Sequence, residues 1–323
     1  MLDARCQRSP TLGSKSGKDR CTKRPRRPAR RFHSAKIGVF ARQSSFSPGC
    51  YRLLSRSVRD SCSRSRVSLT TVEAVGNVGS PIQRLPLFRK LCLAGDSNHG
   101  LDPELEIELI AIPPRSYGLS TNVRPNQRAL LSDYSNVVQH VTQKYTELDK
   151  RDGGQTKIVW YGHSLGASIA TCLLSTVSED EMRERRMVCD GLIFENGFAS
   201  IKGMVRTLYP QRFLPYYWLT PFVMDDWNAL DTFGSCATDS ILNSTPKLFV
   251  ASEKDEMVPT EMVKRVYERA VDHAQPGTPC EWLGIKDALH DFAYQKPSWA
   301  KGLWDFVSRL HTKPSSSRYE STE

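Results

Sequence analysis

Ser164 is the residue whose surroundings best fit a catalytic nucleophile. It stands in the sequence Gly-His-Ser-Leu-Gly, with Gly162 and Gly166 two positions away on either side. This matches the G-x-S-x-G nucleophile elbow, in which a sharp turn from strand to helix lifts the serine hydroxyl above a β-sheet. Side chains at the two flanking positions would clash with so tight a turn, which explains the glycines. A bare match also arises in accidental glycine-rich turns, so the assignment depends on the neighbouring elements.

A serine hydroxyl is a weak nucleophile and needs a general base, together with an acid that orients the base. In hydrolases with this elbow the serine comes first in the chain, the acid second and the histidine last. Downstream of Ser164, Asp255 follows the apolar run 246–252, and His290 follows the next apolar run, 280–285. The order therefore predicts a triad of serine, histidine and aspartate that performs acyl transfer.

Residue types alone leave rivals for both partner positions. Glu253 and Glu256 flank Asp255 and are alternative acids, although charges in such a loop are commonly solvated. His163 lies inside the elbow, where we expect it to point away from the serine. His273 lies near the end of a predicted helix and is expected at the surface. For His290, the candidate base after the last predicted strand, the alternative role is to cap the final helix.

Strand and helix signals alternate along most of the chain, as the elbow requires. Apolar runs typical of strands cover residues 105–113, 157–162, 189–195, 246–252 and 280–285. Helical periodicity or helix-forming composition covers residues 130–145, 167–177, 261–271 and 298–310. This alternation predicts an α/β fold, with a mostly parallel sheet and helices on both faces. In such sheets the active groups gather at the carboxyl ends of the strands.

Basic residues are concentrated at the N-terminus. Residues 1–70 contain 18 of the 45 Lys and Arg residues but only three of the 35 acidic residues. We expect residues 1–69 to form a disordered tail, because they hold too little apolar surface to offset the entropy of ordering. Two alternatives stay open: a mitochondrial transit peptide, which is typically rich in Arg and Ser, and a segment that binds an anionic membrane surface. Nucleic acid is a weaker option, since no stacking platform or DNA-reading motif accompanies the charge.

No metal ion or organic cofactor is expected. The nine cysteines are scattered and include no C-x-x-C pair, which argues against a zinc site and against a disulfide framework. No run of about 18 apolar residues occurs, so no membrane span is expected. The pattern of a secretory signal peptide is also missing from the sequence.

Several motifs, in the same order, resemble those of the α/β-hydrolases of the bud-emergence group, eukaryotic serine hydrolases related to the protein depalmitoylases. The resemblance covers roughly residues 74–310. It rests on the elbow and on the segments 76–88, 113–120, 194–205 and 248–263. The last of these segments carries the acid of the family, which favours Asp255 over its neighbours.

The resemblance implies a domain organisation as well as a fold. We expect an α/β-hydrolase domain over residues 70–312, with a small cap at about 198–236 and a C-terminal tail at 313–323. The family has a membrane helix and two antiparallel edge strands near its N-terminus. Here the basic tail occupies that length, so we expect those edge strands to be missing. The resemblance also implies an intracellular, membrane-associated protein.

The resemblance further implies an oxyanion hole, formed by the main-chain N–H of Leu165 together with that of Asn77 or Val78. The chain departs from the family here, because Val75 stands where a histidine is usual, and Ser116 replaces a glycine in a later turn. Main-chain donors do not depend on side-chain identity, so the hole survives if the loop keeps its path. Loss of one such donor costs about 2.7–4 kcal/mol of transition-state stabilisation.

An aromatic stretch between residues 200 and 235 has two interpretations. One is a cap that packs its aromatic side chains into a small core of its own, and the other is an apolar slot for an acyl chain above the serine. The aromatic side chains are those of Tyr209, Phe213, Tyr216, Tyr217, Trp218, Phe222, Trp227 and Phe233.

The sequence therefore predicts a serine hydrolase that cleaves ester or thioester bonds. Lipid esters and palmitoyl thioesters are the substrates that the resemblance implies, and small-molecule or lipidated acyl groups are the expected partners. A non-catalytic binding protein with the same fold is the alternative, and the altered loop at Val75 favours it. A serine peptidase is a weaker alternative, because no separate substrate-gating domain fits in the remaining length.

Overall fold

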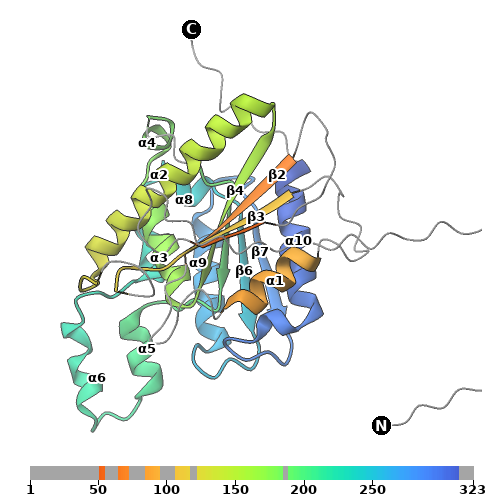
Figure 1. Cartoon of the computed structure of the whole chain (residues 1–323). Coiled ribbons are helices and arrows are strands. Elements are labelled where there is room, and N and C mark those ends of the chain that lie inside the picture. The colour runs from red at the N-terminus through yellow and green to blue at the C-terminus, as the bar shows by residue number, and fades with distance from the viewer. Residues whose placement is uncertain are drawn as a thin grey trace, which may run out of the picture. The chain divides into compact units, whose positions relative to one another are not determined.

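Seven strands form one sheet in the part of the chain that the structure describes (Figure 1). Across the sheet they follow the order β1-β3-β2-β4-β5-β6-β7. Only β1 and β3 pair antiparallel, and the other neighbours are parallel. The strands are β1 (Tyr51–Leu54), β2 (Ser65–Val72), β3 (Glu106–Ile112), β4 (Gln155–His163), β5 (Gly191–Glu195), β6 (Lys247–Ser252) and β7 (Cys280–Ile285).

The computed structural model describes residues 51–54, 65–72, 84–94, 106–116, 122–184 and 188–312. All of them belong to one unit of mutually contacting residues, Ala35–Glu323. The predicted C-terminal tail at 313–323 and the loop that carries Val75, Asn77 and Val78 lie outside the described residues.

Helices follow β2 and each later strand along the chain, and they cover both faces of the sheet. The α-helices are α1 (Leu85–Ala94), α2 (Gln127–Asp152), α3 (Leu165–Ser175), α4 (Glu179–Glu184), α5 (Ile201–Leu208), α6 (Pro215–Leu219), α7 (Ala229–Ser235), α8 (Ile241–Ser244), α9 (Thr260–His273) and α10 (Pro297–Thr312). Two short 3₁₀ turns are η2 (Thr220–Phe222) and η3 (Ala293–Gln295). None of the described helices is both long and apolar enough to cross a membrane.

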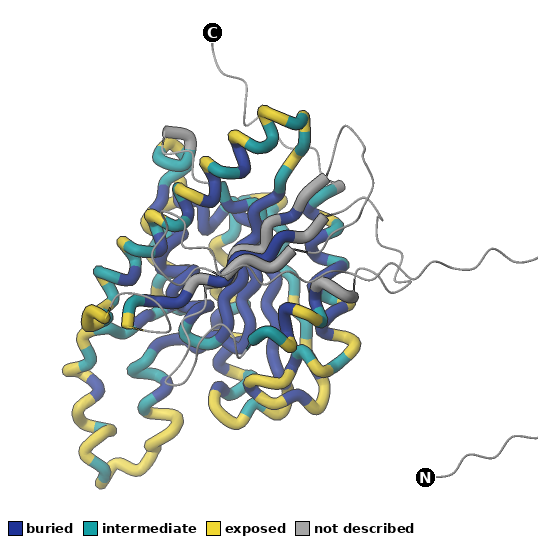
Figure 2. Tube along the Cα trace, in the orientation of Figure 1, coloured by how far each residue is buried: buried dark blue, intermediate teal, exposed yellow. Residues whose placement is uncertain are grey.

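The core consists of two apolar clusters, one on each face of the sheet. Figure 2 shows that the tube is mostly buried along the central strands β4, β5 and β6. Along β4 the side chains alternate between them: Ile158 and Trp160 join the cluster under α2, α3, α7 and α9, while Val159 and Tyr161 join the cluster under α1 and α10. This alternation follows from the two-residue period of a strand. Because both faces are covered, the central strand reads as a continuous apolar run in the sequence. The predicted parallel sheet with helices on both faces is confirmed.

The N-terminal strands differ from the prediction for residues 1–69. Tyr51–Leu54 forms an antiparallel edge strand beside β3, although we expected the N-terminal edge strands to be missing and this region to be disordered. Ser65–Val72 lies further inside the sheet, between β3 and β4. The Arg- and Ser-rich composition conceals a short alternation of apolar and polar residues here. Pairing with β3 and β4 supplies the backbone hydrogen bonds that a composition argument does not register.

Candidate active site

Ser164 occupies the turn between β4 and α3, as the elbow motif predicts. Its backbone angles are φ 55° and ψ −122°, a conformation that is costly for a residue with a side chain. The Ser164 N–H donates to the Glu195 carbonyl oxygen over 2.9 Å, which ties the turn to the end of β5. A Cβ atom on Gly162 would lie 2.5 Å from the Ala167 Cα atom and 2.6 Å from the Gly166 carbonyl oxygen. Glycine at position 162 is therefore a condition for this turn.

Asp255 and His290 are brought together from the loops that follow β6 and β7. The His290 Nδ1 atom lies 2.7 Å from the Asp255 Oδ2 atom, and both side chains are at least 96% buried. The other carboxylate oxygen of Asp255 accepts hydrogen bonds from the main-chain N–H groups of Met257 and Val258, over 2.8 and 2.7 Å. Three donors thus fix the carboxylate, and the imidazole ring has one orientation relative to it.

The two rival acids have other positions. The Glu256 carboxylate accepts a hydrogen bond from the main-chain N–H of His290 over 3.0 Å, so it holds the backbone of this residue and does not contact its ring. Glu253 is exposed. Of the three neighbouring acids, Asp255 is therefore the one that contacts the imidazole. His273, the rival histidine, is exposed at the end of α9, as expected.

No direct hydrogen bond joins the Ser164 hydroxyl to the His290 ring among the described residues. The ring of His163, the residue that precedes the serine, has its centroid 4.8 Å from that of His290, which places the imidazole beside the elbow. Among the described residues, the Ser164 hydroxyl has no hydrogen-bond partner. Hydrogen bonds between a nucleophile and its base are often long in the absence of substrate.

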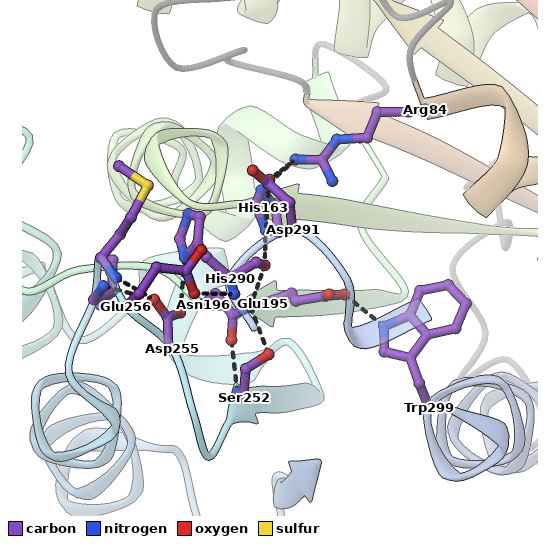
Figure 3. Close-up of polar contacts among 12 residues, drawn as sticks. Arg84, His163, Glu195, Asn196, Ser252, Asp255, Glu256, His290, Asp291 and Trp299 are labelled. Carbon is purple, nitrogen blue, oxygen red and sulfur yellow. Dashed lines mark hydrogen bonds and ion pairs between the residues drawn. The ribbon is translucent and has the colours of Figure 1, made fainter. Parts of the chain in front are cut away.

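His163 is a site residue whose role the sequence did not reveal (Figure 3). The Arg84 guanidinium lies 2.9 Å from its Nδ1 atom, and its Nε2 atom lies 3.0 Å from the main-chain oxygen of His290. A guanidinium can only donate and a carbonyl can only accept, so the ring is neutral and carries its proton on Nε2. Burial, and then the nearby Arg84 and His290, hold the pKa of His163 well below its usual value of 6.5.

Asn196 is a second residue that holds the candidate base. Its amide nitrogen donates to the main-chain oxygen of His290 over 2.7 Å and to the Ser252 hydroxyl over 2.9 Å. Its side-chain oxygen accepts from the main-chain N–H of Ser252 over 2.8 Å. Asn196 is fully buried and has a positive φ of 46°, a conformation that asparagine tolerates better than most residues. The segment that resembles the bud-emergence group contains it, which was the only sequence signal.

Glu195, the last residue of β5, is a buried carboxylate beside the elbow. Its Oε2 atom accepts hydrogen bonds from the Tyr161 hydroxyl and from the Trp299 indole nitrogen, each over 2.8 Å. Burial raises the pKa of this carboxyl group, and the two donors oppose that shift. These contacts connect β4, β5 and α10 at the residue whose main-chain oxygen accepts the hydrogen bond from the Ser164 N–H.

The predicted oxyanion hole is described only in half. Leu165 is the first residue of α3, where main-chain N–H groups have no partner within the helix. The helix dipole at this end also favours negative charge. The second donor was predicted at Asn77 or Val78, which lie outside the described residues.

One cluster has the composition of a metal site but not its chemistry. His163, His290 and Asp291 each offer one atom within 4.8 Å of the others. Both ring nitrogens of His163 are already engaged, and the Arg84 guanidinium lies 2.8 Å from the Asp291 carboxylate. A fixed positive charge at this position repels a cation. The residues present therefore fit a hydrogen-bond network better than a metal centre.

The aromatic stretch does not form a core of its own. Trp227 and Phe233 are buried, and both belong to the apolar cluster under α2, α3, α7 and α9. The remaining aromatic side chains from Tyr209 to Phe222 are exposed or only partly buried. The stretch packs on the domain through its second half, while its first half faces solvent.

The chain is similar in sequence to several curated proteins and similar in structure to several solved ones. An uncharacterized membrane protein of Saccharomyces cerevisiae, YNL320W, is 31% identical over 156 residues, or 48% of this chain and 46% of that protein. Protein bem46 of Schizosaccharomyces pombe is 28% identical and covers 57% of this chain and 50% of its own length. Lysophosphatidylserine lipase ABHD12 of Danio rerio is 28% identical and covers 58% of this chain and 47% of its own length.

A solved structure decides the fold. The truncated form of a carbohydrate esterase from gut microbiota superimposes with a TM-score of 0.53 at 13% identity, over 86% of this chain and 95% of that one. The chain is an α/β-hydrolase-fold protein. The match to bem46 confirms the resemblance to the bud-emergence group. No protein-family model matches the chain, and it spans about half the length of the curated relatives described above.

Proposed function

We propose that this α/β-hydrolase-fold protein is a serine hydrolase that cleaves ester or thioester bonds of acyl substrates. The observation that carries the proposal is the buried contact of 2.7 Å between Asp255 and His290, beside a serine in a strained elbow. A buried carboxylate on the Nδ1 atom of a histidine has a clear catalytic use, because it stabilises the imidazolium that forms when the ring accepts a proton.

Each residue has a defined task in the proposed reaction. The Ser164 oxygen attacks the acyl carbonyl carbon while the Nε2 atom of His290 takes the hydroxyl proton. The main-chain N–H of Leu165, with a donor from the loop at Asn77 or Val78, stabilises the oxyanion. His290 then gives its proton to the leaving alcohol or thiol. Water attacks the acyl-enzyme with His290 as base, which releases the acid and restores the serine.

One relative favours lipid-type acyl substrates. The Danio rerio protein is named a lysophosphatidylserine lipase, and the structural neighbour is named a carbohydrate esterase. Lipid esters are therefore the first substrates to test, and palmitoyl thioesters, which the family resemblance implies, are the second. The basic tail was predicted over residues 1–69, as a contact to an anionic membrane or as a transit peptide. Most of that range, residues 1–50 and 55–64, lies outside the described part of the chain, and both roles stay predictions.

A binding protein without catalysis is the second candidate, and one observation favours it. Within the described residues the Ser164 hydroxyl makes no hydrogen bond to His290, and the altered loop at Val75 adjoins the predicted oxyanion donors. A bound acyl group would then be held in the site without being cleaved.

Hydrolysis of a series of p-nitrophenyl esters, from acetyl to decanoyl, tests the proposal. The wild-type chain should hydrolyse the series, and Ser164→Ala should abolish this activity. Ser175→Ala is the matched control, because it removes a partly buried hydroxyl from the last turn of the same helix, α3. Equal activity in wild type and Ser164→Ala would refute the proposed mechanism. A folded wild type that binds the esters without turnover would support the binding protein.

A further inference from the structure

A short segment of the cap exposes an unusual concentration of large apolar side chains. Six residues between positions 213 and 224 are each between 54% and 92% exposed. We call them the cap surface: Phe213, Tyr216, Trp218, Leu219, Phe222 and Met224. Exposed apolar residues scattered singly are normal in proteins, but a contiguous group marks an interaction site. Elsewhere among the described residues no large apolar side chain is this exposed, and the next is Val123 at 51%.

The cap surface is held in a defined shape by the backbone beneath it. Pro215 begins α6, and the Trp218 indole nitrogen donates to the Arg212 carbonyl oxygen over 2.5 Å. Thr220 is buried, and its hydroxyl donates to the Tyr217 carbonyl oxygen over 2.9 Å. These two hydrogen bonds lie within the segment, while its large apolar side chains are exposed. Figure 2 shows the connection from α5 through α6 as mostly exposed, at the end of the domain away from α10.

The charges around the cap surface indicate which partner fits it. Residues 200–224 contain three basic side chains, Lys202, Arg206 and Arg212, and no acid. Two acids follow Met224, and one of them, Asp226, lies 4.0 Å from the Lys202 ammonium, which leaves the two arginines as the basic groups beside the aromatic side chains. The two arginines lie over the Tyr217 ring, at 6.0 and 5.9 Å from its centroid. Apolar and aromatic side chains beside basic ones match the layered polarity of an anionic bilayer, where Trp and Tyr favour the interface and basic groups meet lipid phosphates.

We propose that the cap surface docks this protein on an anionic lipid bilayer. Phe213, Phe222 and Met224, the three most exposed side chains of the group, enter the acyl region. Arg206 and Arg212 contact the phosphate groups of the lipids.

Docking at this position would present lipid to the candidate active site, a consequence that rests on the proposed function. The cap segment begins just after β5, whose last carbonyl, that of Glu195, accepts the hydrogen bond from Ser164 N–H. The Ser168 hydroxyl also donates to the Phe198 carbonyl oxygen over 3.2 Å, which joins the helix behind the elbow to the root of the cap. A lipid ester taken from the bilayer would therefore enter at the end of the sheet where Ser164 lies.

Flotation of the full chain with lipid vesicles tests the docking. The vesicles contain phosphatidylcholine alone or phosphatidylcholine mixed with phosphatidylserine. The test variant is Phe213→Ser/Trp218→Ser/Phe222→Ser, and Val123→Ser/Val271→Ser is the control, which removes exposed apolar side chains elsewhere. The proposal predicts binding to the mixed vesicles that falls roughly tenfold or more in the test variant, since each lost aromatic side chain removes buried apolar area. The control variant should bind like wild type.

Two further measurements separate the outcomes. Hydrolysis of p-nitrophenyl acetate, which is soluble, should be unchanged in the test variant, and its absence in every variant would refute the proposed function without touching the docking. Equal vesicle binding by wild type and test variant would overturn the docking, because the contact would then lie elsewhere on the chain. Light scattering on the eluting protein reports the oligomeric state. A wild-type dimer that the test variant splits, without vesicle binding, would make the cap surface a contact between two copies and would also overturn the proposal.

Discussion

The Nε2 atom of His163 lies 3.0 Å from the main-chain oxygen of His290, so the residue before the candidate nucleophile holds the backbone of the candidate base. Asn196 donates to the same oxygen over 2.7 Å. Two donors from the ends of β4 and β5 thus fix a loop that follows β7. The elbow and the candidate base are therefore parts of one buried hydrogen-bond network. The first prediction concerns His163, which connects them.

Replacing His163 by leucine should lower kcat more than it raises KM. The substitution removes the donor to the His290 carbonyl and leaves the Arg84 guanidinium without its acceptor on the ring. Loss of a buried partner costs about 1–3 kcal/mol in the free energy of unfolding. His163→Gln, which retains an amide donor near the Nε2 position, should recover much of kcat. Steady-state kinetics on a soluble ester and urea unfolding measure both effects, and identical kcat values for the two variants would contradict the positioning role.

The buried His163 should also make stability fall in mild acid. The pKa of His163 is held well below 6.5 in the folded chain. Between the folded pKa and 6.5, the unfolded chain therefore binds more protons than the folded chain. The stabilisation is therefore present above about pH 6.5 and is lost as the pH falls toward the folded pKa, by at most about 1.4 kcal/mol per pH unit.

His163→Gln isolates this contribution, because it removes one titrating group and leaves the others in place. The raised pKa of Glu195 has the opposite effect on stability, because it stabilises the folded chain at low pH and this contribution fades as the pH rises. Wild type and His163→Gln both contain Glu195, so its contribution cancels in the comparison. Urea unfolding at several pH values between 5 and 7 should show a shallower pH dependence in the variant. The same slope in both proteins would show that His163 does not titrate as described.

Asp255→Asn should reduce kcat by roughly 10⁴-fold, because an amide can no longer stabilise the imidazolium and can favour the wrong tautomer. Glu253→Gln is the matched control, since this neighbouring carboxylate is exposed and makes no side-chain contact to His290 among those described. Ester hydrolysis should be unchanged in the control. A similar loss in both variants would remove the special role of Asp255.

Gly162→Ala should destabilise the fold by about 3 kcal/mol or more, because the added methyl group meets the backbone of Gly166 and Ala167 at 2.5–2.6 Å. Gly234→Ala in α7 provides the comparison. Its Cβ atom would meet the flexible Arg269 side chain at 3.3 Å, so the free energy of unfolding should change by less than about 1 kcal/mol. Denaturant unfolding of both variants measures the difference, and comparable stabilities would mean that the elbow adapts without strain.

The sequence predicted the parts of the site that depend on local pattern. Glycines around a serine, and polar residues just after apolar runs, are features of short segments, and the parallel sheet then brings the carboxyl ends of β4, β6 and β7 together. The contact between Asp255 and His290 lies where this logic expects it. The roles of His163 and Asn196 could not be predicted, because both bind a main-chain oxygen far along the chain, whose position depends on the whole fold.

Two other features escaped sequence reasoning for related physical causes. The strand Tyr51–Leu54 lies in a segment whose composition favours disorder, and it is stabilised by pairing with β3. The aromatic residues of the cap suggested a small core or an acyl slot, yet Phe213 and Trp218 are 84% and 65% exposed. Composition shows how much apolar surface a segment has. Whether that surface is buried or exposed depends on the path of the backbone, here between Pro215 and Thr220.

The most direct test of the account is covalent labelling of the full chain with a fluorophosphonate, followed by mass spectrometry of its peptides. This reagent reacts with serines that a neighbouring base activates. We expect one phosphonylated residue, Ser164, with labelling lost in Ser164→Ala and strongly slowed in Asp255→Asn. A folded wild-type chain that takes up no label, or that is labelled at another serine, would contradict the assignment of Ser164 as the nucleophile.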